Sequence, residues 1–404
     1  EGVDNLGFDR REVPPEAQSR GRILAHHRHY LPSDWVFTGE FGLVSDRNFL
    51  EQYYETEWDT LKDQITGIEL KKYTENRSLS VTTDVRLNEF FTQTEWLPRV
   101  DHFTFGQSLL MDRLTWHEHS HVGYARLQTA TTPTNPVDLA KFSPMPWEVD
   151  QEGIRAATRQ ELDLPLDFGP VKIVPYVLGE AAYWGNDIQS EEVTRLFGQT
   201  GIRASLPMWT ADPTIQSELL NVNGMAHKVV FDTEFLYADV SEDMTRFPLY
   251  DQLDDDAQEA FRRRMVVNTF GQASGTFVPL QYDERFYALR SNLQGWVSSP
   301  STEIADDLTA FRAGVRQRWQ TKRGLPGQER IVDWITLDVD AYLFPMPGRD
   351  NFGADIGLVD YDFAWHVGDR VTLLSDGFYD FFDQGLAQVT IGGLFSRPEY
   401  GSLY

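Results

Sequence analysis

The pentapeptide HEHSH places histidines at the alternate positions 117, 119 and 121. Imidazole nitrogens are common ligands of zinc and other transition metals. In a β-strand, residues i, i+2 and i+4 point to one face, roughly 6.5–7 Å apart along the strand. Two of His117, His119 and His121 could reach one ion, and three less easily. The spacing favours a polar stripe on a strand over a metal site, and we predict no cofactor.

Two further sets of charged residues share a strand parity. Asp338 and Asp340 lie two positions apart, as the carboxylates of a hydrolase pair could, but no nucleophile motif accompanies them. Arg312, Arg316 and Arg318 form a row of guanidinium groups, which can bind phosphates bidentately. A polar lining in which these arginines pair with facing acids is the simpler interpretation. We predict that the protein is not an enzyme.

The elements that carry these residues alternate apolar and polar side chains. Between positions 78 and 88 the leucines and valines occupy one parity and the polar residues the other, which is the period of a strand. The segments with the same pattern are 34–43, 228–237, 286–297, 310–319 and 335–343. Candidates for an apolar, lipid-facing surface are Trp35, Phe37, Leu79, Val81, Val85, Phe231, Phe235, Leu337 and Val339. Candidates for a polar, lumen-facing surface are Asp84, Arg86, Arg290, Arg312, Arg316, Arg318, Asp338 and Asp340.

Composition narrows the class of protein. The chain has 404 residues, a formal net charge of −26, 13% aromatic residues and no cysteine. So large an acidic surplus argues against nucleic acid as a partner, because a phosphate backbone requires clustered Lys and Arg. Without cysteine, the chain has neither disulfides nor thiolate metal ligands. No uncharged apolar run approaches the roughly 20 residues that a membrane-spanning helix needs.

Strand length separates a membrane barrel from a soluble β-protein. Strands of soluble proteins average about 5–6 residues, whereas strands of about 9–11 residues with aromatic ends are typical of outer-membrane barrels. Several alternating runs here are of the longer kind. We therefore predict an all-β fold, an antiparallel transmembrane β-barrel of outer-membrane type, with one domain over residues 1–404 and about 14–16 strands. A porin-like passive channel and a secreted β-rich carbohydrate-binding protein stay open as alternatives.

The connections between the strands follow the same scheme. TENR (74–77) and TKRGLPGQER (321–330) are expected to join neighbouring strands as hairpin loops. The Pro-rich and charged stretches 129–153 and 241–265 are expected to form long loops at one end of the barrel, with a short helix at 254–265.

Two phrases also carry a family resemblance. FGLVSDRNFLEQYYETEWDT (41–60) and VRLNEFFTQTEWLPRVD (85–101) resemble the C-terminal barrel of the LptD family, lipopolysaccharide-assembly proteins also described as organic solvent tolerance proteins. The similarity runs from about residue 20 through most of the chain. It implies a protein of the cell outer membrane that receives lipopolysaccharide from a periplasmic Lpt bridge and inserts it into the outer leaflet through a lateral opening of the barrel. An LptE-like lipoprotein plug is the implied partner. The family's N-terminal jelly-roll domain has no counterpart here, so the resemblance implies an incomplete barrel fragment.

Overall fold

The computed structural model describes the chain with several gaps. The described residues are 2–7, 10–60, 64–142, 149–251, 294, 302–303, 305–325, 327–351, 353–379, 381, 387–397 and 401–403. None of the helices in these ranges combines the length and the hydropathy that a membrane crossing requires.

One antiparallel sheet of 17 strands dominates the described residues. Within the sheet, strands that follow one another in the chain pair with one another, except that β9 pairs with β11, and the short strand β10 pairs only with β11. The strands of the first half are β3 (Arg22–Leu31), β4 (Trp35–Val44), β5 (Thr66–Thr74), β6 (Arg77–Val85), β7 (Gln93–Leu109), β8 (Leu114–Gln128), β9 (Gln151–Asp163), β10 (Leu166–Phe168) and β11 (Val171–Trp184). Those of the second half are β12 (Val193–Ser217), β13 (Val222–Val240), β14 (Leu308–Arg323), β15 (Arg330–Leu343), β16 (Ile356–His366), β17 (Val371–Tyr379), β18 (Ala387–Arg397) and β19 (Gly401–Leu403).

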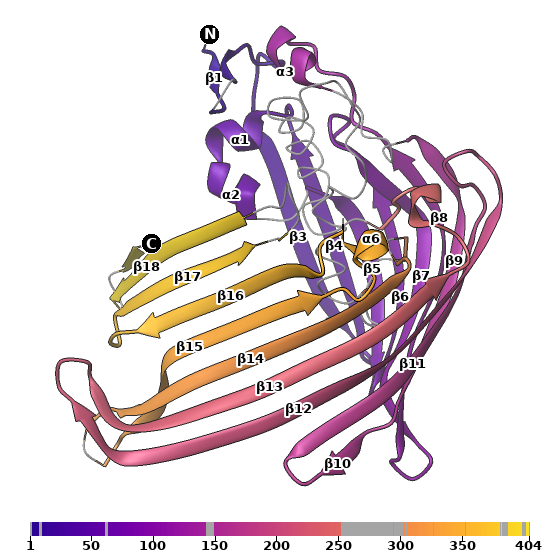
Figure 1. Cartoon of the computed structure of the whole chain (residues 1–404). Helices are drawn as coiled ribbons and strands as arrows, with labels where there is room; N and C mark the ends of the chain where they lie inside the picture. The colour runs from indigo at the N-terminus through magenta and orange to yellow at the C-terminus, as the bar shows by residue number, and fades with distance from the viewer. Residues whose placement is uncertain are drawn as a thin grey trace.

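The sheet is strongly curved but not closed. Figure 1 shows β3–β9 behind and β12–β18 in front, with the chain bending round between them at β11. At one end of the series β3 pairs with β4, and at the other β18 pairs with β19. Among the described residues, no strand register joins β19 back to β3. A separate small sheet contains β1 (Asp4–Asn5) and β2 (Arg11–Val13).

The described helices all lie at one end of this sheet. In an antiparallel meander every second connection emerges at the same end, and helices occur in the connections that follow β4, β8, β13 and β15. They are α1 (Phe49–Tyr53), α2 (Glu55–Thr60), α3 (Pro136–Lys141), the 3-10 helix η1 (Met244–Arg246) and α6 (Pro347–Asp350). We refer to this end as the helix end; the connections at the opposite end are mostly short turns.

The two faces of the sheet differ in polarity. On β6, Leu79 and Val81 are 39% and 38% exposed, whereas Ser78 and Ser80, which alternate with them, are each 5% exposed. On β13, Phe231 and Phe235 are exposed and Glu234 is buried. Because residues directly paired across strands lie on the same face, the registers join these positions into one apolar outer face and one polar inner face. The strand pattern thus buries polar groups and exposes apolar ones.

Apolar packing is concentrated on the inner side, near the helix end. One buried cluster contains Trp96, Trp184 and Val193 from the strands together with Phe247 and Tyr250 from the connection that follows β13. The rings of Trp184 and Phe247 lie 4.1 Å apart. A second cluster joins Leu178, Phe197, Leu236 and Leu308 of the strands to Ala305 of the same connection. The described parts of the β13–β14 connection therefore pack onto the inner face of the sheet.

Comparison with the sequence-based expectations confirms the all-β antiparallel class. The hairpins expected at TENR and TKRGLPGQER are confirmed, because they join β5 to β6 and β14 to β15. The expected 14–16 strands are too few, since 17 pair in the large sheet. Strands β10 and β19, of three residues each, are too short to show an alternation. The helix expected at 254–265 lies outside the described residues, and so does the segment 286–297 except for Gln294.

The sequence-based expectations also omitted the short helices that the structure contains. Each of the described helices has six residues or fewer, so none spans enough turns to show a helical period. One local signal was present: the Asn135 side chain accepts a hydrogen bond from the Asp138 backbone N–H, and Pro136 occupies the first turn of α3. Both features are typical of a helix N-terminus.

Candidate functional site

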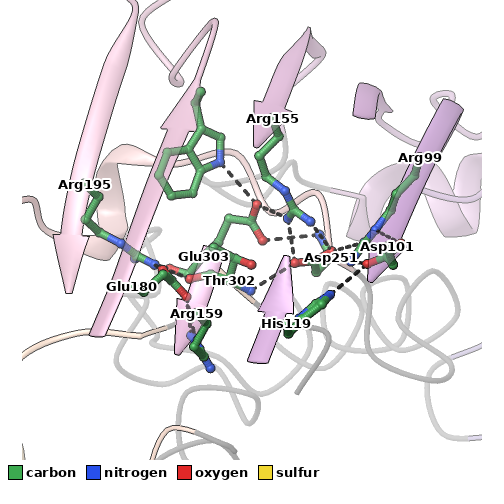
Figure 2. Close-up of polar contacts among 11 residues, drawn as sticks. Arg99, Asp101, His119, Arg155, Arg159, Glu180, Arg195, Asp251, Thr302 and Glu303 are labelled. Carbon is green, nitrogen blue, oxygen red and sulfur yellow. Dashed lines mark hydrogen bonds and ion pairs between the residues drawn. The ribbon is translucent and has the colours of Figure 1, made fainter. Parts of the chain in front are cut away.

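Buried ionisable side chains gather on the inner face beneath the β13–β14 connection (Figure 2). Eight of them come from strands β7, β8, β9, β11 and β12, and two come from the connection itself. We define this charged cluster as Arg99, Asp101, His119, His121, Arg155, Arg159, Glu180, Arg195, Asp251 and Glu303. It contains four arginines and four acids, so its formal charges balance when every acid is ionised.

Strand alternation explains how the eight strand residues reach one face. On β9, the odd positions from Gly153 to Asp163 are buried, and Arg155 and Arg159 fall on this parity. The register pairs Arg159 with Glu180 of β11, and the next ladder pairs Glu180 with Phe197, two positions from Arg195. Opposite charges are thereby placed on adjacent strands, where cross-strand pairs interact most strongly.

Arg155 lies at the centre of the cluster and is completely buried. Its Nη1 and Nη2 groups donate to the two carboxylate oxygens of Asp251 at 2.5 and 2.8 Å. Nη1 also contacts the Glu303 carboxylate, which accepts a second hydrogen bond from Trp184 Nε1 at 3.2 Å. Asp251 in turn accepts a hydrogen bond from Arg99 at 2.7 Å. One strand arginine therefore binds two acids that both belong to the connection.

A second centre forms around Glu180. Its carboxylate accepts hydrogen bonds from Arg159 Nε at 2.7 Å and Arg195 Nη2 at 2.8 Å. Arg195 also donates to backbone carbonyls of the connection, those of Thr302 and, at 3.0 Å, Ala305. Each half of the cluster thus bonds strand side chains to the connection. Since an unpaired buried charge costs several kcal/mol, the cluster stabilises one position of the connection on the inner face.

The two acids of the connection respond oppositely to their surroundings. Burial and the nearby charge of Asp251, only partly offset by Arg155, raise the pKa of Glu303 from 4.5 to about 7. Burial also opposes ionisation of Asp251, but the charges of Arg155 and Arg99 outweigh it and hold the Asp251 pKa far below its ordinary value. Of these two acids, Glu303 is therefore the one that changes charge near neutral pH, while Asp251 stays ionised.

The arginine row of β14 lies on the inner face and is already bound to acids. Arg312 contacts Asp232 at 2.9 Å and Asp340 at 3.1 Å, and Arg316 contacts Asp340 at 2.6 Å. Arg318 donates to Asp338 at 2.8 Å. The structure thus has the arginines and acids paired with one another, as in the simpler interpretation of this row.

A glycine makes room for this pairing. Gly314 lies between Asp232 and Asp340 in the register of β13, β14 and β15. A Cβ atom at position 314 would lie 2.6 Å from one oxygen of Asp232 and 2.8 Å from one oxygen of Asp340. Real Cβ atoms do not approach oxygens so closely, so a larger residue would displace the carboxylates that bind the arginines.

The remaining polar candidates, Asp84, Arg86 and Arg290, occupy three different kinds of position. Asp84 lies on β6 next to Gly67 of β5, its direct partner in the ladder. Arg86 follows the last residue of β6 and donates to the Gln128 side chain at 2.9 Å and to the Thr129 carbonyl at 3.0 Å. It therefore connects the segment after β6 to the end of β8, at the helix end of the sheet. Arg290 lies outside the described residues.

The nine lipid-facing candidates all lie on the outer face, by the strand registers. Leu79, Val81, Val85, Phe231 and Phe235 are exposed. The other four, Trp35, Phe37, Leu337 and Val339, are of intermediate exposure. The Lys72 ammonium lies 5.6 Å from the Trp35 ring centroid. An apolar surface therefore extends across the outer side of both halves of the sheet.

The three histidines of HEHSH share the inner face but have different surroundings. His117 faces Asp163 at 3.6 Å and accepts a hydrogen bond from the Gly106 backbone N–H at 3.2 Å. His119 donates to Asp101 at 2.8 Å. His121 lies in the charged cluster, so the three do not form one site. Among the residues that the structure describes, Asp101, His119 and His121 form a group that is compact enough for a metal ion.

Sequence reasoning missed most of the charged cluster. Arg155 and Arg159 had a visible signal, because they share a parity in the alternating segment 151–163. Asp251 and Glu303 had none, because they lie 96 and 148 residues from Arg155 in the chain. No known protein-family model matches this chain, and no curated protein sequence matches it either. A functional conclusion therefore has to be built on the geometry described above.

Proposed function

We propose that this chain is part of the wall of an outer-membrane β-barrel that inserts lipopolysaccharide into the outer leaflet. In this proposal the outer face contacts lipid, the inner face lines a polar lumen, and the lipid leaves through a lateral opening between strands. The sequence resemblance to the LptD family supplies the substrate class. The polarity of the sheet supports the location.

The observation that carries the proposal is the apolar outer face. Its exposed members include residues of β3, β6, β13 and β18, such as Ile23 at 59% and Ile391 at 82% exposure. A soluble monomer rarely exposes a contiguous apolar patch of more than a few hundred Å². Contact with lipid removes this surface from water at a gain of about 25 cal/mol per Å². The ladders meanwhile satisfy the backbone polar groups between paired strands, as a lipid environment requires.

The inner face of β13–β17 suits a ligand that carries cations. Against the three arginines of the β14 row, this face presents six aspartates, Asp232, Asp338, Asp340, Asp360, Asp362 and Asp376, which the registers place on one side. A bare phosphate would be repelled by this surplus. Lipopolysaccharide phosphates bridged by Ca²⁺ or Mg²⁺ would instead be attracted to the carboxylates, because these ions prefer oxygen ligands.

In this proposal, two partners and one exit path for the lipid follow from the sheet. The β13–β14 connection occupies the inner face at the charged cluster, so an LptE-like lipoprotein plug would contact other parts of the inner face. A periplasmic Lpt bridge would deliver the lipid. An amphiphile can leave the lumen sideways only where two neighbouring strands separate, since every other position is closed by a hydrogen-bonded ladder. The acyl chains would pass through that separation while the sugar stays in the polar interior.

Site-specific photo-crosslinking in an outer-membrane-bearing host tests the proposal. A photoreactive residue at Asp84 or Asp338 probes the inner face. One at Val81, on the same strand as Asp84, or at Phe231, two strands away from Asp338, probes the outer face. We expect inner-face probes to capture lipopolysaccharide only while the transport bridge is energised. Outer-face probes should capture membrane lipid whether or not the bridge is active.

Three results would contradict the proposal in different ways. If the purified protein conducts ions in planar bilayers and the inner-face probes capture no lipopolysaccharide, a porin-like passive channel replaces it. If the protein stays soluble without detergent, the outer face does not contact lipid, and a secreted carbohydrate-binding protein becomes the better interpretation. Capture that is independent of the bridge would refute the energised transport step.

A further inference from the structure

His121 is the most poorly satisfied polar side chain of the charged cluster. It is 6% exposed, and neither of its ring nitrogens has a hydrogen-bond partner. Buried polar atoms are nearly always hydrogen-bonded, and a bound water or ion is one explanation of an exception. The neighbouring His119, by contrast, is bonded to Asp101 and stacks on Phe103 with ring centroids 3.9 Å apart.

The surroundings of His121 contain the other donors that a metal ion requires. Ligand atoms of Asp101, His119 and His121 all lie within 4.8 Å of one another, and all three residues are buried. The rings of His119 and His121 are 5.0 Å apart, on adjacent inner-face positions of β8. Bonds of 2.0–2.1 Å in a tetrahedral site imply ligand atoms roughly 3.3 Å apart. Small side-chain rotations would bring the ligand atoms from within 4.8 Å of one another to this spacing.

We propose that Asp101, His119 and His121 form a binding site for one divalent transition-metal ion. Two imidazoles and one carboxylate are a ligand set that zinc and related ions accept, with the fourth position left to water. The stacking of His119 on Phe103 fixes one ligand in advance. The Arg99 side chain, which donates to both Asp101 oxygens at 2.8 Å, orients the carboxylate from outside the ligand set.

Charge in the vicinity does not oppose a cation. The two closest arginines of the cluster, Arg99 and Arg155, are bound to three acids, Asp101, Asp251 and Glu303. These five groups sum to a formal charge of −1 when all are ionised and to zero when Glu303 holds a proton. Binding requires the ion to displace the hydrogen bond between His119 and Asp101. That exchange is favourable because the ion also satisfies the otherwise unpaired His121.

Metal binding is measured directly on the full chain in detergent after treatment with a chelator. Exposed histidines on β3 could bind zinc adventitiously, so the background protein carries His27→Gln and His29→Gln, which remove a stacked pair. Zn²⁺ is titrated by calorimetry, and Co²⁺ is added separately because its visible absorption reports coordination number. The test variant is His121→Gln. The matched control is His117→Gln, on the same strand and face.

We expect the background protein and the His117→Gln variant to bind one Zn²⁺ with equal affinity, and the Co²⁺ spectrum to indicate four-coordination. His121→Gln should weaken binding at least tenfold, with unchanged folding by circular dichroism. A background protein that binds no Zn²⁺ would overturn the proposal and leave a buried water as the partner of His121. Equal binding by the His121→Gln variant would overturn it as well. The test does not depend on the transport function, because it reads binding alone.

Discussion

Replacing Arg155 by methionine tests whether the charged cluster holds the β13–β14 connection on the sheet. Arg155 is completely buried and is bound to Asp251 and Glu303, which are 4% and 0% exposed. Methionine keeps much of the side-chain volume but leaves these acids without their shared partner. Removing one member of a buried ion pair costs about 3–5 kcal/mol.

The structure places the expected loss at the low end of that range. Asp251 keeps its 2.7 Å contact with Arg99, and Glu303 can take up a proton because its pKa is already about 7. A loss of about 3 kcal/mol corresponds to a roughly 100-fold larger population of the detached connection. The strand ladders do not involve the Arg155 side chain, so the sheet should remain folded.

Hydrogen exchange measured by mass spectrometry distinguishes detachment of the connection from unfolding of the sheet. In Arg155→Met, protection of residues 244–251 should fall roughly 100-fold, while protection of the β12 and β13 strands stays unchanged. The control is Arg318→Met, which removes a pair that is about one-third exposed on the same face and should cost at most about 1 kcal/mol. The triple variant Arg155→Met, Asp251→Asn, Glu303→Gln should restore most of the protection, because no buried charge is left unpaired. Unchanged protection in Arg155→Met, or a triple variant no better than the single one, would refute the reasoning.

Three further predictions concern pH, packing and the outer face. The folded-state pKa of Glu303 lies above its unfolded value, so the folded connection retains a proton that the unfolded chain loses between pH 4.5 and about 7. Denaturation midpoints should therefore fall as pH rises through that window, and Glu303→Gln should make this slope shallower. Gly314→Ala should destabilise the fold by about 1–3 kcal/mol, because its Cβ would overlap the Asp232 and Asp340 carboxylates; a variant with the same urea midpoint as the parent would contradict the close approach. Phe231→Lys should reduce membrane insertion by about 2–4 kcal/mol if this position lies near the middle of the bilayer. The control is Thr233→Lys, on the same face but nearer the strand end. Equal recovery of the two variants in the membrane fraction would argue against lipid contact at Phe231.

The alternating faces of the strands could be predicted from the sequence. A side-chain period of two is a local property, so Leu79, Val81 and Phe231 could be assigned to one face without knowledge of the partners of their strands. For the same reason, the arginines of β14 and the aspartates of β15 could be assigned to one face. A short hairpin joins these strands, but a register shift between Trp319 and Gln320 separates its turn from the arginine–aspartate pairs, so the pairing itself was decided by the tertiary structure.

The charged cluster was decided by the tertiary structure. Asp251 and Glu303 lie in a long connection, outside its alternating segment at 286–297, and only the folding of the described parts of this connection back onto the inner face brings them to Arg155. The compact group that includes His121 depends in the same way on Asp101 of the neighbouring strand, not on the histidine spacing alone. Local alternation determines which face a side chain occupies. The identity of its partner depends on the register of several strands and on the path of a distant loop, and no single stretch of sequence encodes either.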